Sequence, residues 1–304
     1  MSLPPTSPRQ TLSYLRDLFE QRGIRPKNKL GQNFLIDLNL LDLIVRRAEL
    51  GPEDLAVEVG SGTGGLTTRL AEHAGAVLSV EIDTAFSALV QAAVASYGDK
   101  VVLLHADVLK NKNELNPDVL RAVAELKQRA GCSSVKLVAN LPYAVAVPVI
   151  SNFLLRDEPP ERMVVTVQWE IAERLTARPD TKDYGALAVL VQSLADVELV
   201  RQLSPAVFWP RPQVASAIVL VRPNPRKRAH VEAAVGDVRR FREFLRDLYV
   251  HRRKNLRGAL AGSPRGRVDK AEVDQKLAAL GLEGTVRAEA LDTEQHLRLC
   301  AAFG

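Results

Sequence analysis

Cysteine is scarce in this sequence, and no long apolar run occurs. The two cysteines, Cys132 and Cys300, are too few and too far apart along the chain to form a disulfide framework or a zinc cluster, as is typical of a reducing cytoplasm. The most apolar stretch, 144–155, contains a proline and two polar residues and falls short of the ~20 residues that cross a bilayer. The first ten residues lack the apolar stretch of a secretory signal. We therefore expect a cytoplasmic protein without a membrane span.

The length and composition are those of a globular protein. Its 304 residues are about twice the ~150 of a typical domain, which favours two domains. Hydrophobic residues make up 46% of the chain and charged residues 25%, close to the values of ordinary soluble proteins. This composition excludes disordered, collagen-like and coiled-coil chains.

The basic residues are concentrated near the C-terminus. Of the chain's 41 Lys or Arg and 36 Asp or Glu, 18 and 11 lie in residues 222–304, so the whole basic surplus is there. Its densest part, 239–257, has two interpretations: a surface that binds a polyanion, or a solvated helix face. Phe241, Phe244 and Tyr249 recur at helical spacing, so we expect them to pack inside the protein rather than to stack on bases.

Short apolar runs predict the strands of a largely parallel sheet. Continuous runs, rather than alternating ones, fit strands that are covered on both faces, and helical patterns between them imply a doubly wound α/β sheet. Residues 111–134 carry apolar positions at helical spacing and predict a helix with polar flanks. The runs that predict strands lie at 55–59, 77–80, 101–104, 135–139, 163–167 and 217–221.

The pattern changes after Pro223 and Pro225. From Val231 onward the sequence shows repeated helical patterns, glycine-rich breaks and no convincing strand. We therefore place a domain boundary near 222–230. The predicted organisation is an N-terminal extension at 1–24, an α/β domain at 25–224 and a basic helical domain at 225–304.

A glycine-rich segment, 58–65, follows the first predicted strand. Glycines here let the backbone approach a ligand at a helix N-terminus. Gly60, Gly62 and Gly65 also satisfy the dinucleotide pattern, with Glu81 roughly 20 residues further on at the end of the second strand. An ionised carboxylate there could accept both hydroxyls of a ribose. The segment predicts a nucleotide site but does not distinguish NAD from S-adenosylmethionine.

Asp107 follows the third predicted strand. An adenine amino group could donate to it, although taken singly the residue is as typical of a helix cap. Together with the glycine-rich segment and Glu81 it lies at the carboxyl ends of successive strands, where open α/β sheets bind ligands. This convergence strengthens the prediction of a nucleotide site.

The fourth predicted strand ends in Asn140, Leu141, Pro142 and Tyr143. An adenine amine is a poor nucleophile because its lone pair is delocalised into the ring. If the Asn140 side-chain oxygen and the Leu141 carbonyl both accept from the amine, they favour a pyramidal nitrogen that can attack an electrophilic methyl. Pro142 fixes the backbone, and the Tyr143 ring can contact the base and the developing positive charge. Neither a metal nor a general base is required.

These motifs together resemble the KsgA/Erm family of rRNA adenine N6-dimethyltransferases, specifically the KsgA branch that modifies small-subunit rRNA. The resemblance extends from about Arg25 to the end of the chain. It includes LGQNFL at 30–35 with Asp37 close behind. Other matching residues are Phe208, Pro210, Pro212, Val214, Ser216, Arg252, Arg253, Lys254, Asn255, Leu256, Arg257, Arg287, Ala288 and Glu289.

The resemblance implies a Rossmann-like, seven-stranded methyltransferase sheet followed by a smaller all-helical domain. It implies that Tyr143 and Phe208 sandwich the target adenine as part of a catalytic group with Asn140, Leu141 and Pro142. Without it, Phe208 would be interpreted as a core residue. The implied contacts to S-adenosylmethionine, whose product is S-adenosylhomocysteine, are Gln32, Asn33, Leu35, Gly60, Gly62, Glu81, Ile82, Asp107, Val108 and Asn140.

Some positions depart from the usual family pattern. They are less polar than is common after the tetrad, or lack a frequent Lys or Asp, and they flank the substrate site. We therefore expect these departures to affect substrate recognition and not the type of reaction. These positions are Ala144, Ala146, Val147, Trp169, Gln213 and Ala215.

The predicted function is dimethylation of two adjacent adenosines in a hairpin loop of small-subunit (16S) rRNA. The implied partner is a pre-ribosomal 30S-type particle, and we expect a monomer. Three alternatives stay open: an Erm-like enzyme for 23S rRNA, in which Ile is more common at the position of Leu141, a non-catalytic ribosome assembly factor, and an NAD-dependent oxidoreductase.

Overall fold

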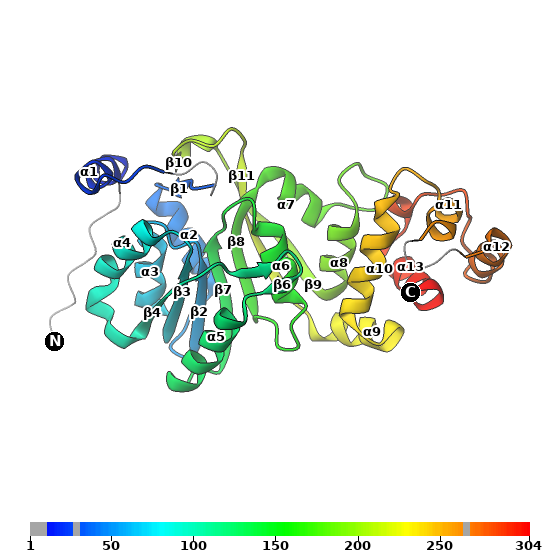
Figure 1. Ribbon diagram of the computed structural model, residues 1–304, viewed down its shortest axis with the longest axis horizontal. Coiled ribbons are helices and arrows are strands. Elements are labelled where there is room, and N and C mark those ends of the chain that lie inside the picture. Colours follow the sequence, from blue (N-terminus) through cyan, green and yellow to red (C-terminus); the bar gives the residue numbers. More distant parts are fainter. Residues whose placement is uncertain (1–10, 27–30, 264–267) are drawn as a thin grey trace. The chain divides into compact units, whose positions relative to one another are not determined.

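The computed structural model describes residues 11–26, 31–263 and 268–304 (Figure 1). The chain divides into two compact units, each of which contains two segments of the sequence. The first unit comprises Met1–Ala172 and Glu198–Arg222, and the second comprises Glu173–Val197 and Pro223–Gly304.

The first unit is an α/β structure. Helix α7 and strand β9 run across its boundary with the second unit. In chain order its elements are α1 (Leu12–Arg22), β1 (Phe34–Leu35), α2 (Leu38–Ala48), β2 (Asp54–Val59), α3 (Gly65–His73), β3 (Ala76–Glu81), α4 (Thr84–Val94), the 3₁₀ helix η2 (Ala95–Lys100), β4 (Val101–His105), β5 (Leu109–Asn111), β6 (Glu114–Leu115), α5 (Pro117–Arg129), β7 (Ser134–Asn140), α6 (Ala146–Leu154), β8 (Arg162–Gln168), α7 (Trp169–Thr176), β9 (Ala195–Leu203), the 3₁₀ helix η3 (Pro205–Val207), β10 (Phe208–Trp209) and β11 (Ser216–Pro223).

Seven strands form the main sheet in the order β4-β3-β2-β7-β8-β11-β9. The strands from β4 to β8 are parallel neighbours, and β11 runs antiparallel to β8. Every residue of β2 and β3 is buried, which explains why these strands read as continuous apolar runs. The predicted seven-stranded Rossmann-like sheet is confirmed, and so are the six strands predicted individually.

Two strand features were missed in the sequence. Strand β9 lies at the edge of the sheet, and its exposed and half-buried residues include several charged side chains, so it lacks a continuous apolar run. The β5–β6 hairpin begins before the segment 111–134 and occupies its first residues. The helix predicted in that segment is present as α5, with Asn116 as its N-cap.

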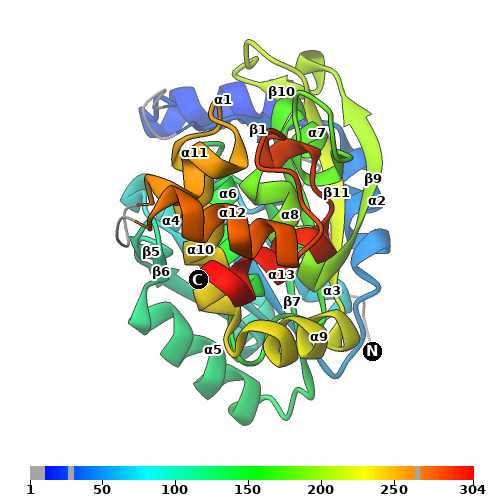
Figure 2. The same cartoon turned by 90° about the vertical axis from the view of Figure 1, so that its right-hand side faces the viewer.

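Apart from the first residues of β9, the regular elements in the described part of the second unit are helices (Figure 2). Helix α8 (Ala186–Leu194) packs against α9 (Pro225–Val235), α10 (Val238–Val250) and α13 (Thr293–Phe303). The remaining helices are α11 (Leu256–Ala261), α12 (Lys270–Ala279) and the 3₁₀ helix η4 (Ala288–Ala290). None of the helices in the described part of the chain is long and apolar enough to cross a membrane.

The segment 173–197 corrects the predicted domain organisation. The sequence analysis assigned it to the α/β domain at 25–224, whereas the structure places it in the helical unit. The reason is α8, whose buried apolar residues pack on α9, α10 and α13, which lie much later in the chain. Sequence proximity to the strands on either side gave no signal of this long-range packing.

A buried ion pair joins β2 to β7 at the start of the sheet. Lys136 Nζ lies 2.8 Å from the Asp54 carboxylate and donates to the Glu49 carbonyl at 2.6 Å. Both charged residues are less than a tenth exposed. Burial alone would raise the pKa of Asp54, but hydrogen bonds from Lys136 and Ser134 outweigh burial and hold that pKa below its usual value. Asp54 therefore remains an ionised carboxylate in the folded protein at neutral pH.

We predict that Lys136→Met lowers the free energy of unfolding by about 3–5 kcal/mol, because it leaves the Asp54 carboxylate buried without its cation. Urea denaturation measures this loss. The exposed Arg121–Asp118 pair on α5 is a matched control, and Arg121→Met should cost less than about 1 kcal/mol. Equal losses in the two variants would contradict this interpretation of Lys136.

Candidate active site

A cavity of about 230 Å³ lies at the carboxyl ends of the parallel strands of the first unit. The segments that follow β2, β3, β4 and β7 form its walls, together with residues 31–35 around β1. This is the edge at which open parallel sheets bind ligands. The fold therefore brings the predicted nucleotide motifs to one place.

The cavity collects all but one of the predicted site residues. Its lining includes Gln32, Asn33, Leu35, Gly60, Gly62, Glu81, Ile82, Asp107, Val108, Asn140, Leu141, Pro142 and Tyr143. Phe208 is the exception among these predicted residues. Leu30 of the LGQNFL motif lies outside the described residues.

The glycine-rich loop needs glycine at two positions for identifiable reasons. Gly60 and Gly62 have φ values of +79° and +55°. A Cβ at Gly60 would lie 3.0 Å from the Pro142 ring, and one at Gly62 would lie 2.8 Å from the Phe34 ring. The loop is thus packed against the tetrad on one side and against the 31–35 segment on the other, in a left-handed conformation that favours glycine.

Glu81 is held at the end of β3 by backbone donors. Its Oε2 accepts from the Gly62 N–H at 3.0 Å, and its Oε1 accepts from the Asp83 N–H at 2.9 Å. Burial raises the pKa of Glu81, although these hydrogen bonds oppose the rise. Since a carboxylate can accept about four hydrogen bonds, each oxygen retains capacity for a ligand hydroxyl.

The hairpin that follows Asp107 fixes the position of this residue. Its Oδ1 accepts from the Leu109 N–H at 2.9 Å, so it caps β5 and not a helix. The side chain of Asn116 donates to the Asp107 carbonyl at 2.9 Å and at the same time caps α5. The Asp107 backbone is therefore fixed from two sides at the cavity wall.

The side chain of Asn140 has a defined orientation. Its Nδ2 donates to the Asn33 carbonyl at 2.9 Å. A carbonyl oxygen can only accept, so the amide nitrogen must face Asn33, and Oδ1 remains as an acceptor on the other side of the amide. Leu141, the next residue, also lines the cavity. The orientation of Asn140 thus leaves Oδ1 available as one of the two predicted acceptors, and the role of the tetrad stays a prediction.

Tyr143 is anchored through its hydroxyl group. The oxygen lies 2.6 Å from Oγ of Ser216, a fully buried residue at the start of β11. The ring itself lines the cavity and is half-buried. Ser216 was recognised only as part of the family pattern, and no local sequence signal connects it with Tyr143, because 73 residues separate them.

Phe208 departs from its predicted place at the substrate site. It is 3% exposed and belongs to the apolar core together with Leu35 and Leu203. Its backbone pairs with Leu35 in the two-stranded β1–β10 sheet. The residue-based interpretation of Phe208 as core describes this structure, whereas the stacking role that the family resemblance implied requires the ring to leave the core.

Glu58, Phe34 and Phe86 also line the cavity. Glu58 lies in the glycine-rich segment and Phe34 in the LGQNFL motif, but no site role was predicted for either, and Phe86 lies in no motif. The Glu58 carboxylate is fully buried and accepts from Thr67 at 2.5 Å and from Ser79 at 2.8 Å. Burial raises the pKa of Glu58 to about 7, in spite of these two hydrogen bonds. Phe86 had no signal because an apolar residue on a helix is normally a core residue.

The basic residues of the second unit fall into two groups. The Arg252 side chain pairs with Glu289 at 3.0 Å and donates to the Lys182 and Tyr184 carbonyls, and Arg257 makes a bidentate pair with Asp274. Arg253 and Lys254 are exposed as well, but neither forms an ion pair with another described residue. The aromatic residues behave as predicted: Phe241 and Phe244 are buried, and Tyr249 stacks on His296.

The sheet, the glycine loop and the acidic residues at successive strand ends define a Rossmann-like methyltransferase. A family model described as "Ribosomal RNA adenine dimethylase" matches residues 23–300. The chain belongs to this family, which confirms the resemblance noted in the sequence and the predicted class of enzyme, an S-adenosylmethionine-dependent methyltransferase.

Individual relatives cover nearly the whole chain. The "Ribosomal RNA small subunit methyltransferase A" of Geobacillus kaustophilus is 37% identical, over 95% of this chain and 94% of the relative. The protein of the same name from Pediococcus pentosaceus is 38% identical, over 93% and 92%. Among solved structures, a dimethyladenosine transferase from Plasmodium falciparum has a TM-score of 0.68 at 22% identity, covering 86% of this chain and 94% of its own. The 23S rRNA methyltransferase ErmE has a TM-score of 0.59 at 25% identity, covering 89% and 99%.

The cavity residues fit S-adenosylmethionine. The Glu81 carboxylate can accept from ribose hydroxyls, Asp107 can accept from the adenine amine, and the glycine loop leaves its backbone open to close approach. The apolar residues Leu35, Ile82 and Val108 line the same cavity and can contact an adenine ring. The individual contacts remain predictions.

We predict that Gly62→Ala weakens binding of S-adenosylhomocysteine by about tenfold or more, because the new Cβ collides with Phe34 and displaces a cavity wall. Isothermal titration calorimetry measures the change. Gly131→Ala is the control, since Gly131 also has a positive φ of +66° but a Cβ at this position would meet no atom within 4 Å. Unchanged affinity in Gly62→Ala would argue against a close fit at this loop.

We predict that Glu58→Gln removes part of the pH dependence of stability. The pKa of Glu58 rises from 4.5 to about 7 on folding, so its protonated form stabilises the fold below pH 4.5, and this contribution is lost as the pH rises through 7. Relative to Glu58→Gln, the wild type should lose about 3 kcal/mol of unfolding free energy across that window. Urea denaturation of both proteins at pH 4.5 and pH 8 measures this loss. If the unfolding free energies of the two proteins changed in parallel with pH, the raised pKa of Glu58 would be contradicted.

Proposed function

We propose that this chain is the adenine N6,N6-dimethyltransferase of small-subunit (16S) rRNA and that it modifies two adjacent adenosines in a hairpin loop during small-subunit biogenesis. The names of the relatives that are 37% and 38% identical support the choice of subunit. The observation that carries the chemistry is the fixed orientation of Asn140, whose amide nitrogen is held by the Asn33 carbonyl.

The residues of the tetrad account for activation of the adenine amine. Asn140 Oδ1 and the Leu141 carbonyl accept its two N–H bonds, which favours a pyramidal nitrogen with a directed lone pair. The Tyr143 ring, anchored by Ser216, contacts the base and the positive charge that develops on the nitrogen. S-adenosylmethionine, when bound, supplies an electrophilic methyl group. The alkylated nitrogen is acidic and loses its proton to water, so no side chain of matched pKa is needed.

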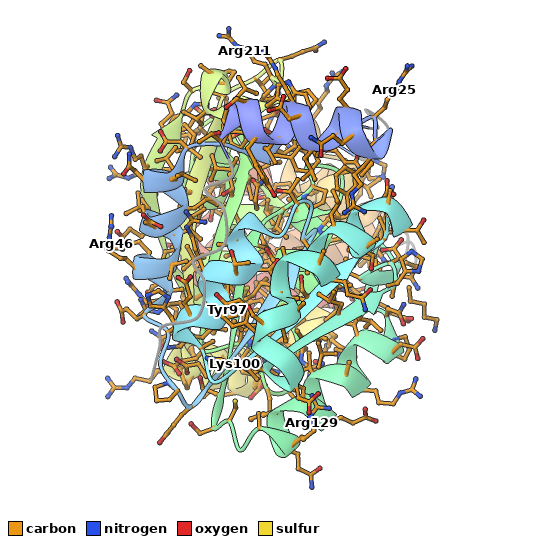
Figure 3. The ribbon with its side chains drawn as sticks, turned by 90° about the vertical axis from the view of Figure 1, so that its left-hand side faces the viewer. Arg25, Arg46, Tyr97, Lys100, Arg129 and Arg211 are labelled. Atoms are coloured by element: carbon orange, nitrogen blue, oxygen red, sulfur yellow. The ribbon has the colours of Figure 1, made fainter. Side chains whose placement is uncertain are left out.

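An unpaired loop is a suitable substrate for such a site. A target base must leave its stack, which costs least where pairing is absent, and contact with an aromatic ring such as Tyr143 returns about 1–3 kcal/mol. Exposed cations on each unit can contact the phosphates. In the first unit, Arg25 and Arg211 extend away from the ribbon (Figure 3), and in the second unit Arg253 and Lys254 are exposed. We propose a pre-ribosomal particle as the partner of a monomeric, cytoplasmic enzyme.

An Erm-like activity on 23S rRNA is the second candidate. The similarity to the ErmE structure, at 25% identity and a TM-score of 0.59, favours it. It is weaker than the sequence similarity to the small-subunit enzymes, and Leu141 stands where Ile is more common in Erm enzymes. The two candidates share their chemistry and differ in the RNA.

The test is methylation of purified, undermethylated ribosomal subunits with labelled S-adenosylmethionine, followed by mass spectrometry of the rRNA. We predict dimethyladenosine in the small subunit. Asn140→Ala should lower kcat by about 10²-fold or more, as removal of a preorganised hydrogen-bonding group does in other active sites.

The control for this assay is Asn39→Ala, which changes an exposed asparagine of α2 and should leave the rate unchanged. Methylation of the large subunit alone would refute the proposed substrate and favour the Erm-like alternative. Calorimetric binding of NAD without binding of S-adenosylhomocysteine would refute the cofactor.

A further inference from the structure

The N-terminal helix α1 packs directly behind the cofactor cavity. Its buried residues Leu15 and Phe19 form an apolar cluster with Phe34, Phe86 and Leu89. Phe34 and Phe86 line the cavity, whereas α1 supplies none of the residues identified on its wall. Figure 1 shows α1 beside the paired strands β1 and β10. The helix therefore supports the cavity wall from outside.

Phe19 is at the centre of this support. It is 3% exposed, and its ring centroid lies 5.5 Å from that of Phe34, 5.6 Å from that of Phe86 and 5.0 Å from that of Trp209. The Phe34 and Phe86 rings are themselves 5.1 Å apart. Aromatic rings at these separations attract one another in edge and tilted geometries. One side chain of α1 thus contacts two rings of the cavity wall and the strand that pairs with β1.

The position of Phe34 matters for both halves of the active site. Phe34 lies against Gly62 of the glycine loop, so closely that a Cβ on this glycine would collide with its ring. The adjacent residue, Asn33, accepts the hydrogen bond that orients Asn140. A displacement of Phe34 would therefore move the cofactor loop contact and the partner of the catalytic amide together.

We propose that Phe19 is a positioning residue of the cofactor site, which holds residues 31–35 closed on the glycine loop through Phe34 and Phe86. The inference rests on the proposed function, since it takes the cavity as the S-adenosylmethionine site. It gives the predicted N-terminal extension, 1–24, a role in activity. Phe19 touches neither cofactor nor substrate and acts only through the two cavity-lining rings.

The experiment compares Phe19→Ala with Phe153→Ala. Phe153 of α6 is another buried phenylalanine of the first unit, 1% exposed, and it lines a different cavity. Binding of S-adenosylhomocysteine is measured by calorimetry at a temperature where circular dichroism shows that all the variants are folded. Phe19→Ala should raise Kd by about tenfold or more, and Phe153→Ala should stay within about twofold of the wild type. Phe19→Leu, which keeps an apolar side chain, should restore much of the affinity.

Hydrogen exchange provides a readout that loss of overall stability would not reproduce. In Phe19→Ala the amides of residues 31–36 should exchange faster than in Phe153→Ala, when the two variants are compared at equal margins below their unfolding temperatures. Phe19→Leu loses the ring contacts to Phe34 and Phe86, so it should still bind more weakly than the wild type. If Phe19→Ala does not fold, this smaller loss tests the proposal, and wild-type affinity and exchange in Phe19→Leu would overturn it.

Each outcome decides one question. If the wild type binds S-adenosylhomocysteine and both Phe19 variants bind equally well, Phe19 is only a core residue and the inference is overturned. If the wild type does not bind this ligand at all, the proposed function fails first. Weak binding in Phe19→Ala but not in Phe153→Ala, with faster exchange at 31–36 and partial recovery in Phe19→Leu, supports the positioning role.

Discussion

The hydrogen bond from the Asn140 side chain to the Asn33 carbonyl is the interaction on which the candidate site depends. Asn140 ends the central strand β7, whereas Asn33 belongs to a segment that precedes the sheet. An amide that faced the other way would present two donors to the substrate amine, which itself donates. Under the proposed function, the Asn33 carbonyl therefore determines whether the Asn140 side chain offers an acceptor to the adenine amine.

This dependence makes the site composite. The tetrad follows strand β7, but the groups that orient its side chains lie far away in the sequence. The Asn33 carbonyl orients the Asn140 amide, and the Ser216 hydroxyl anchors the Tyr143 ring. The same 31–35 segment lies against the glycine loop through Phe34. Under the proposed function, a short stretch of backbone therefore links the cofactor loop to the catalytic amide, because a shift of residues 31–35 alters both contacts.

The sequence predicted what is local or repetitive in this structure. Strands covered on both faces must be apolar throughout, so β2, β3 and β7 were visible, and residues at strand ends converge by topology alone. It did not predict contacts between distant residues. The pairing of Tyr143 with Ser216 and the position of Phe86 at the cavity wall depend on tertiary neighbours that no local pattern encodes. Helix α8 was assigned to the wrong unit for the same reason.

The arginines of the second unit show how composition overstates a binding surface. Arg252 and Arg257 lie in the densest basic segment, yet their guanidinium groups are engaged by Glu289 and Asp274. A cation already paired within the protein releases fewer counterions from RNA, since it must first give up its carboxylate partner. Under the proposed function, the C-terminal charge surplus therefore overstates the number of cations available to RNA phosphates. Arg252 and Arg257 instead connect segments of the helical unit through the Glu289 and Asp274 carboxylates.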